Sequence, residues 1–137
     1  MPKIREILIS VILIFTVGLI IGCEGNSDMQ DEKVTYEQIT AKEAKEIMDN
    51  KTGYLILDVR TEEEYVSGHI ENAILIPDYE IETRAESELT DKEQMILVYC
   101  RSGRRSKGAA EKLAELGYRN VKEFGGIIDW TYGVVTE

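Results

Sequence analysis

The sequence predicts an α/β fold in which a central, mainly parallel sheet is flanked by helices in three layers. Segments with the composition of buried strands alternate along the chain with segments whose apolar residues recur at helical spacing. Two of the helical segments also open on the spacing of a capping box, at residues 40–43 and 61–64. Because strands that alternate with helices pair in parallel, we expect helices to cover both faces of the sheet.

The first 22 residues differ in character from the rest of the chain. Lys3 and Arg5 precede an uncharged apolar run over residues 7–21, which is shorter than a membrane-spanning helix and fits the apolar core of a secretory signal. The end of this run, Leu19-Ile20-Ile21-Gly22-Cys23, resembles a bacterial lipoprotein signal. The resemblance implies that residues 1–22 are cleaved off and that Cys23 carries lipid. An uncleaved anchor and an unmodified secretory signal are the alternatives, and all three place the domain outside the cytoplasm.

The expected domain spans residues 34–137 and follows a polar and acidic tether over residues 23–33. Its first half contains four predicted elements. Thr40 begins a helix that should end near Asp49. The elements that follow are a buried strand over 54–59, a short helix that opens at Thr61 and closes at Gly68, and a short strand over 73–76.

The second half continues the alternation. A weak helical periodicity over residues 78–94 is followed by a strand over 95–100. Apolar residues then recur at helical spacing from Ser106 to a stop at Gly117, and residues 121–124 form the last short strand. Gly125-Gly126 leads into a final turn that contains Trp130, which we interpret as a packing residue, with an aromatic ligand platform as the alternative.

The charge balance argues against two kinds of partner. The chain carries a net charge of −10, so nucleic acid and anionic lipid surfaces are not expected to bind it electrostatically. The sequence has no Walker loop, no dinucleotide-binding glycine pattern and no Cys-x-x-Cys zinc spacing. We therefore expect no metal and no cofactor.

The most informative segment is the loop that follows the strand ending at Cys100. Arg101, Arg104 and Arg105 follow this cysteine, and a helical pattern begins directly afterwards. Cationic side chains and a helix N-terminus lower the pKa of a thiol, and the thiolate is the nucleophile. With Cys23 occupied by lipid, Cys100 has no partner for a disulfide within the chain. The sequence therefore predicts a reactive thiolate, and the alternative is an inert core thiol.

Four motifs together resemble the rhodanese family of sulfurtransferases in its single-domain form. They are Asp58-Val59-Arg60, Glu64-Tyr65-Val66-Ser67-Gly68-His69-Ile70 with Ala73, Cys100-Arg101-Ser102-Gly103-Arg104-Arg105-Ser106, and Gly125-Gly126-Ile127 with Trp130. The resemblance implies a rhodanese-like fold and a reaction in which Cys100 accepts a sulfane sulfur from thiosulfate, a persulfide or a similar donor. A thiol or cyanide then removes this sulfur from the Cys100 persulfide.

The resemblance also implies roles for the residues around the nucleophile. The backbone N–H groups of residues 101–105 surround the sulfur, so the substrate-binding loop consists of Arg101, Ser102, Gly103, Arg104 and Arg105. Arg101 and Arg105 hold this loop and the anionic donor. Asp58 and Arg60 support it, with Asp58 accepting hydrogen bonds that make neighbouring loops rigid. His69, the only histidine, is expected to be structural rather than a general base.

Two other functions remain open from the sequence. The first is a non-catalytic rhodanese-like module that binds a partner or senses redox state. The second is phosphatase or arsenate-reductase activity, for which the related phosphatases use a loop one residue longer. Four residues separate Cys100 from Arg105, which favours sulfur transfer. The short ending after Gly133 leaves the docking of the C-terminus open.

Overall fold

The computed structural model describes residues 33–137 of the chain. The expected signal peptide over residues 1–22, the lipidation site Cys23 and nearly all of the tether lie outside the described residues. Within residues 33–137, no helix has the length and apolar character needed to cross a membrane.

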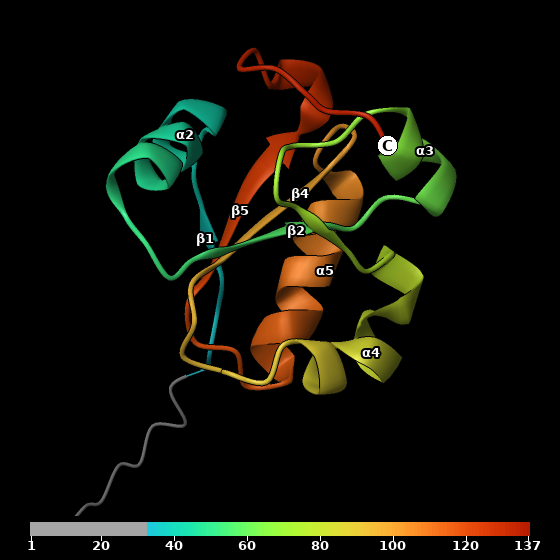
Figure 1. Ribbon diagram of the computed structural model, residues 1–137. Coiled ribbons are helices and arrows are strands. Elements are labelled where there is room, and N and C mark those ends of the chain that lie inside the picture. The colour runs from blue at the N-terminus through green and yellow to red at the C-terminus, as the bar shows by residue number, and fades with distance from the viewer. Residues whose placement is uncertain (1–32) are drawn as a thin grey trace, which may run out of the picture. The chain divides into compact units, whose positions relative to one another are not determined.

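The core of the fold is a five-stranded sheet in which every pair of neighbouring strands is parallel (Figure 1). The strands lie in the order β1-β5-β4-β2-β3. Their bounds are β1 Glu37–Gln38, β2 Leu55–Asp58, β3 Ile74–Leu75, β4 Ile96–Cys100 and β5 Val121–Gly126. The predicted α/β fold with a parallel sheet is therefore confirmed. Strand β1 was not predicted, because its two residues carry no apolar alternation.

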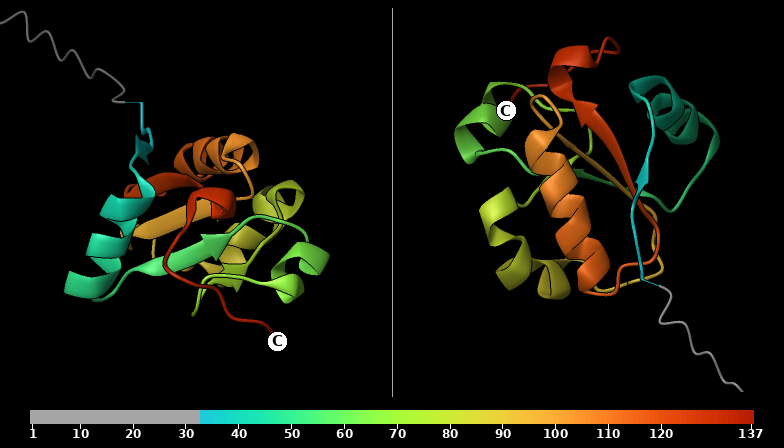
Figure 2. Two further views of the ribbon diagram at one scale, coloured as in Figure 1. Left: turned by 90° about the horizontal axis from the view of Figure 1, so that it is seen from above. Right: turned by 180° about the vertical axis from the view of Figure 1, so that it is seen from behind.

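The helices form two layers, one on each face of the sheet (Figure 2). Their bounds are α2 Ala41–Asn50, α3 Glu62–Ser67, α4 Ile81–Glu88 and α5 Arg104–Glu115, with short 3-10 turns η1 Asp78–Glu80 and η2 Ile127–Asp129. Side chains of α4 and α5 pack on one face, and α2 packs on the other. The helix expected from Ser106 begins two residues earlier, because Gly103 takes a left-handed conformation that allows Arg104 to enter the first turn.

Both predicted capping boxes are present, and they fix the starts of α2 and α3. The Thr40 hydroxyl accepts a hydrogen bond from the Glu43 N–H at 3.1 Å, and the Glu43 carboxylate accepts one from the Thr40 N–H at 2.7 Å. Thr61 and Glu64 repeat the arrangement at 3.3 and 3.1 Å. Each box satisfies N–H groups that a helix end otherwise leaves without partners, so the sequence pattern and the helix boundary agree.

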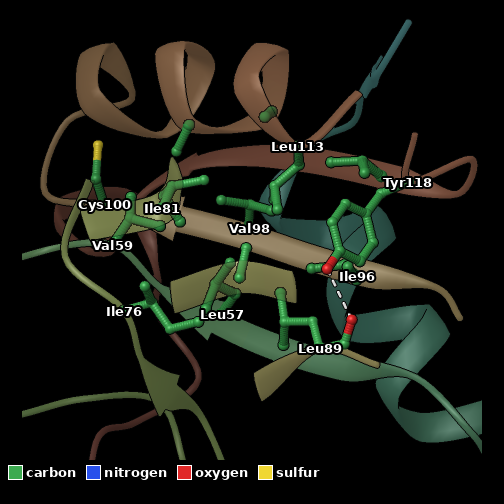
Figure 3. Packing of buried hydrophobic residues seen from close by; sticks show 14 residues of the cluster. Leu57, Val59, Ile76, Ile81, Leu89, Ile96, Val98, Cys100, Leu113 and Tyr118 are labelled. Atoms are coloured by element: carbon green, nitrogen blue, oxygen red, sulfur yellow. Dashed lines mark hydrogen bonds between the residues drawn. The ribbon is translucent and has the colours of Figure 1, made fainter. Parts of the chain in front are cut away.

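The alternation of side chains along β4 divides the core in two. All five residues of this central strand are buried. Ile96, Val98 and Cys100 face the layer of α4 and α5, whereas Leu97 and Tyr99 face the opposite layer. Figure 3 shows Cys100 at one end of the row formed by Ile96, Val98 and Cys100, with its sulfur on the side of the sheet that α5 covers. The strand thus delivers the cysteine to its carboxyl end on the α5 face.

The C-terminal segment is docked onto the domain. His69 and Val135 pair as an antiparallel bridge, and each donates its N–H to the other's carbonyl oxygen at 2.9 Å. The Trp130 indole N–H also donates to the carbonyl oxygen of Gly133 at 2.9 Å. The short ending after Gly133 is therefore held against the domain by backbone pairing at His69.

Candidate active site

Cys100 lies at the junction between β4 and the loop that leads into α5. The residue is 1% exposed. Its sulfur accepts a hydrogen bond from the Gly103 N–H at 3.0 Å and lies 3.3 Å from the Ser106 hydroxyl oxygen. The first turn of α5 therefore lies against the sulfur.

The loop can take this path because two glycines leave space for it. Gly103 has a φ of +106°, a conformation that residues with a Cβ rarely adopt. Gly126, at the end of β5, lies directly against the backbone of the loop. A Cβ at Gly126 would come within 1.9 Å of the Arg101 carbonyl oxygen and 2.6 Å of the Ser102 Cα. The end of β5 therefore fixes where the loop runs.

The environment of Cys100 favours the thiolate despite its burial. Burial alone raises the pKa of a thiol, but the hydrogen bond with the Ser106 hydroxyl and those from the N–H groups of Ser106, Gly103 and Ser102 outweigh it. The pKa of Cys100 consequently lies below its ordinary value. The donors to the sulfur include the N–H of Ser106, which lies just outside the predicted range of residues 101–105.

The three arginines of the loop have different surroundings. Arg101 and Arg104 are exposed. Arg105 instead donates two hydrogen bonds to the Glu64 carboxylate of α3, at 2.7 and 2.8 Å. Its guanidinium holds the pKa of Glu64 down at about 2, and the pKa of Arg105 is raised in turn. Arg105 therefore ties the start of α5 to α3, and its contact with an anionic donor stays a prediction.

Glu64 was missed as a site residue, because its place in a capping box already accounted for it. The same carboxylate completes the cap of α3 and receives Arg105. Only the fold brings these two residues together across a sequence separation of 41 residues.

Ser106 and Glu123 were also missed. The Ser106 hydroxyl, beside the sulfur, donates to Glu123 Oε1 of β5 at 2.6 Å. The same oxygen accepts the Gly125 N–H at 2.8 Å. Glu123 is 2% exposed. A charged residue inside a short strand pattern was the available signal, since such a residue seldom lies in a core without a specific partner.

The predicted supporting pair Asp58 and Arg60 lies away from the sulfur. Asp58 is in register with Tyr99, and both side chains leave the sheet on the face opposite to Cys100. The Asp58 carboxylate accepts hydrogen bonds from the Tyr99 hydroxyl at 2.6 Å and from the Arg60 guanidinium at 2.7 Å. Arg60 also donates to the Gly68 carbonyl oxygen at 2.7 Å. Asp58 thus accepts hydrogen bonds from Arg60 and Tyr99, and the support of the substrate-binding loop by Asp58 and Arg60 stays a prediction.

His69 and Trp130 have structural surroundings. His69 is buried, stacks on Tyr65 with ring centroids 3.7 Å apart, and lies with Nδ1 2.9 Å from the Tyr65 carbonyl oxygen. Trp130 packs against Phe124 at 5.7 Å between centroids. It also lines a surface pocket of about 350 Å³ beside α2, so the structure shows packing at Trp130 and keeps the ligand platform as an alternative.

A second pocket opens beside the start of α5. Its volume is about 280 Å³, and its lining includes Arg104, Arg105, Lys112 and Asp78. Because Arg105 is paired with Glu64, Arg104 and Lys112 leave a small excess of positive charge over Asp78 in this pocket. Among residues 33–137, no cluster of three or more His, Cys, Asp or Glu side chains has the geometry to hold a metal ion.

The fold and this site together define a class of protein. An α/β domain presents a cysteine at the carboxyl end of a central parallel strand, and a short loop encloses the sulfur with N–H groups at the start of a helix. Such a site stabilises an anion on sulfur and needs little acid–base machinery.

The chain belongs to the rhodanese-like domain family, whose pattern matches residues 40–132. The thiosulfate sulfurtransferase PspE of Escherichia coli is 41% identical over 73 residues, which are 53% of this chain and 70% of PspE. The thiosulfate sulfurtransferase GlpE of Coxiella burnetii is 36% identical over 96 residues, with 69% of this chain and 87% of GlpE covered. The crystal structure of a rhodanese-related protein from Thermoplasma volcanium matches with a TM-score of 0.64 at 34% identity, over 74% of this chain and 100% of that chain.

Proposed function

We propose that this protein is a sulfurtransferase that moves a sulfane sulfur from thiosulfate or a similar donor to a thiophilic acceptor through a persulfide on Cys100. The observation that carries the proposal is the set of hydrogen bonds that the loop directs at the Cys100 sulfur. The names of two relatives, both thiosulfate sulfurtransferases, support it.

The reaction has two balanced steps. In the first, the Cys100 thiolate attacks the outer sulfur of thiosulfate, the bond between the two donor sulfurs breaks, and sulfite leaves with the electron pair. In the second, an acceptor such as cyanide or a thiolate attacks the outer sulfur of the persulfide and regenerates the Cys100 thiolate. The N–H groups of Gly103 and Ser106 stabilise the negative charge on sulfur both in the free Cys100 thiolate and in the Cys100 persulfide.

The cations of the loop recruit the anionic donor. Arg101 and Arg104 are exposed on a chain of net charge −10, so they form a local positive region at the mouth of the loop. Arg105 keeps the loop in place through Glu64. The short loop between Cys100 and Arg105 favours a sulfur atom over a tetrahedral phosphate or arsenate.

We also propose that the protein is exported and held at a membrane by lipid on Cys23, with residues 23–33 as a tether. The apolar run over residues 7–21 and the residues that precede Cys23 support this arrangement. Metabolic labelling with a fatty-acid analogue tests it, with Cys23→Ser as the variant that should lose the label and Cys100→Ser as the control that should keep it.

The experiment that tests sulfur transfer is the intact mass of the full-length chain before and after thiosulfate. We expect a gain of one sulfur atom, its removal by cyanide, and no gain in Cys100→Ser. Cys23→Ser is the matched control, because it removes the other cysteine of the chain and should still gain the sulfur. A folded, reduced native chain that gains no sulfur contradicts the proposal.

A second candidate function rests on the burial of Cys100. A thiol that is 1% exposed and packs with the core also suits a module that binds a partner without turnover, whereas redox sensing, the other form of this alternative, needs an accessible thiol. This candidate predicts that partner binding survives in Cys100→Ala. The sulfurtransferase proposal predicts that all transfer is lost in the same variant.

A further inference from the structure

Glu123 is a buried carboxylate that the proposed reaction does not use. The residue is 2% exposed, and its carboxylate oxygen Oε1 accepts hydrogen bonds from the Ser106 hydroxyl and the Gly125 N–H. Glu123 takes part in none of the ion pairs found within residues 33–137. A buried charge that lacks a cationic partner is costly, so a specific reason for a carboxylate at this position is expected.

The Ser106 hydroxyl joins Glu123 to the sulfur of Cys100. Its oxygen lies 2.6 Å from Glu123 Oε1 and 3.3 Å from the sulfur. A hydroxyl carries one proton and two lone pairs. When its proton points to Glu123, a lone pair can receive the proton of the Cys100 thiol. When its proton points to the sulfur, it stabilises the thiolate and can accept a proton from a neutral Glu123.

The two acidic groups cannot both be ionised without cost. A thiolate and a carboxylate connected by a single hydroxyl repel each other, and burial weakens the screening by water. A site that holds one negative charge between the two groups avoids this cost.

In the described part of the chain, no charged group near Cys100 and Glu123 neutralises the repulsion between the thiolate and the carboxylate. On α5, Arg105 acts on Cys100 through its charge, but its guanidinium is paired with Glu64 of α3 and also faces Asp78 of η1. Arg101 and Arg104 extend into solvent. From β1, the residue in register with Glu123 is the uncharged Gln38. No other ionisable side chain among residues 33–137 is hydrogen-bonded to Ser106 or Glu123.

We propose that Cys100 and Glu123 share one proton through Ser106, and that Glu123 is the internal acceptor of the Cys100 proton. When the thiolate forms, the S–H bond of Cys100 breaks as its proton moves to the Ser106 oxygen. The O–H bond of Ser106 breaks in turn, and its proton forms an O–H bond with Glu123. No proton leaves the protein, and the charge moves from the carboxylate to the sulfur. Glu123 is thus a positioning residue that acts on the nucleophile through Ser106.

The first test is the pH dependence of Cys100 alkylation by iodoacetamide, followed on the full-length chain by peptide mass spectrometry that resolves Cys100 from Cys23. The native chain should show two steps separated by at least about one pH unit, because coupled groups give two apparent pKa values. Glu123→Gln keeps an oxygen for both hydrogen bonds but cannot be ionised, so it should show one step. Glu111→Gln, which removes an exposed carboxylate of α5, should keep both steps.

The second test is the infrared carbonyl band of a protonated carboxylic acid at pH 7, where ordinary glutamates are ionised. The native chain should show this band, and both Glu123→Gln and Cys100→Ser should lose it, because each removes one partner of the shared proton. Cys100→Ser carries the test if Glu123→Gln does not fold.

The proposal is overturned if alkylation of the native chain follows the same single step as in Glu123→Gln, or if the native chain has no such band at pH 7. The inference rests on the proposed function only for the use that sulfur transfer makes of the thiolate. Neither measurement needs a sulfur donor, so a chain that fails to accept sulfur still tests the shared proton. The burial of Cys100 lowers the overall alkylation rate without changing the number of steps.

Discussion

Replacing Gly126 with alanine tests whether the end of β5 sets the position of the nucleophile loop. The backbone of Gly126 has a φ of −127°, which any residue can adopt, so strain in the backbone is not the issue. The obstacle is space, because the added Cβ would lie 1.9 Å from the carbonyl oxygen of Arg101, 2.4 Å from its carbonyl carbon and 2.6 Å from the Ser102 Cα.

The magnitude follows from which atoms collide. All three are backbone atoms of the loop, so no flexible side chain can turn aside, and the loop must move outward by more than an ångström to restore ordinary contact. Overpacking of this kind costs about 1–3 kcal/mol of folding free energy. The same displacement carries the N–H donors away from the Cys100 sulfur, and a misplacement of about 1 Å in a catalytic site costs on the order of 100-fold in rate.

Two assays on one set of variants measure these effects. Urea denaturation should show Gly126→Ala to be less stable by the stated amount. The midpoint of the first step in Cys100 alkylation should move to higher pH as hydrogen bonds to the thiolate are lost. Gly108→Ala is the matched control, because a Cβ there meets nothing within 4 Å. In the middle of α5, this change should add about 0.5–1 kcal/mol of stability. Unchanged stability and an unchanged midpoint in Gly126→Ala would refute the reasoning.

Three further predictions concern the contacts around the loop and the opposite face of the sheet. Arg105→Lys should slow sulfur transfer at least about tenfold, because lysine cannot make the paired hydrogen bonds to Glu64 that are worth about 1.5–3 kcal/mol; steady-state rates equal to those of the native chain would contradict this. Glu64→Gln should lower stability by about 1 kcal/mol at pH 7 after allowance for solvent screening. Because folding lowers the pKa of Glu64 from 4.5 to about 2, the stabilisation is full above pH 4.5 and disappears as pH falls through 2. Denaturation at several pH values checks this, and a gap that does not narrow in acid would exclude the ion pair as its source. Tyr99→Phe should cost about 1–3 kcal/mol, since it leaves the buried Ile70 N–H without its acceptor. The alkylation midpoint of Cys100 in Tyr99→Phe should match the native value, and a shifted midpoint would show that the two faces of the sheet are coupled.

The sequence predicted most of the fold because its signals are local. Capping boxes at Thr40 and Thr61 and the apolar strand that ends at Cys100 each depend on a few neighbouring residues, and each matches an element of the structure. β1 escaped prediction because its two residues are exposed and owe their strand conformation to pairing with β5. A strand of two residues is too short to show an alternation of apolar residues, so the sequence of β1 gives no signal of its distant pairing partner.

The site was predicted in part for the same reason. The loop from Cys100 to Arg105 is contiguous, so residue types alone indicated an anion cradle, and the structure places N–H donors around the sulfur. Glu64 and Glu123 reach the site from α3 and β5, far away in sequence. Their roles depend on where the fold places them, since a glutamate in a helix cap or in a short strand more often serves the cap itself or faces solvent.

The central sheet also separates two kinds of change that the protein can accept. The thiol leaves β4 on one side, and the hydrogen-bonded group of Asp58, Arg60 and Tyr99 leaves on the other. Insertions or exchanges in the segment between Cys100 and α5 therefore meet α3, α5 and the end of β5, while the frame behind the sheet keeps its contacts. The length of this loop, and with it the chemistry of the site, can therefore be changed while the hydrogen bonds of Asp58, Arg60 and Tyr99 stay as they are.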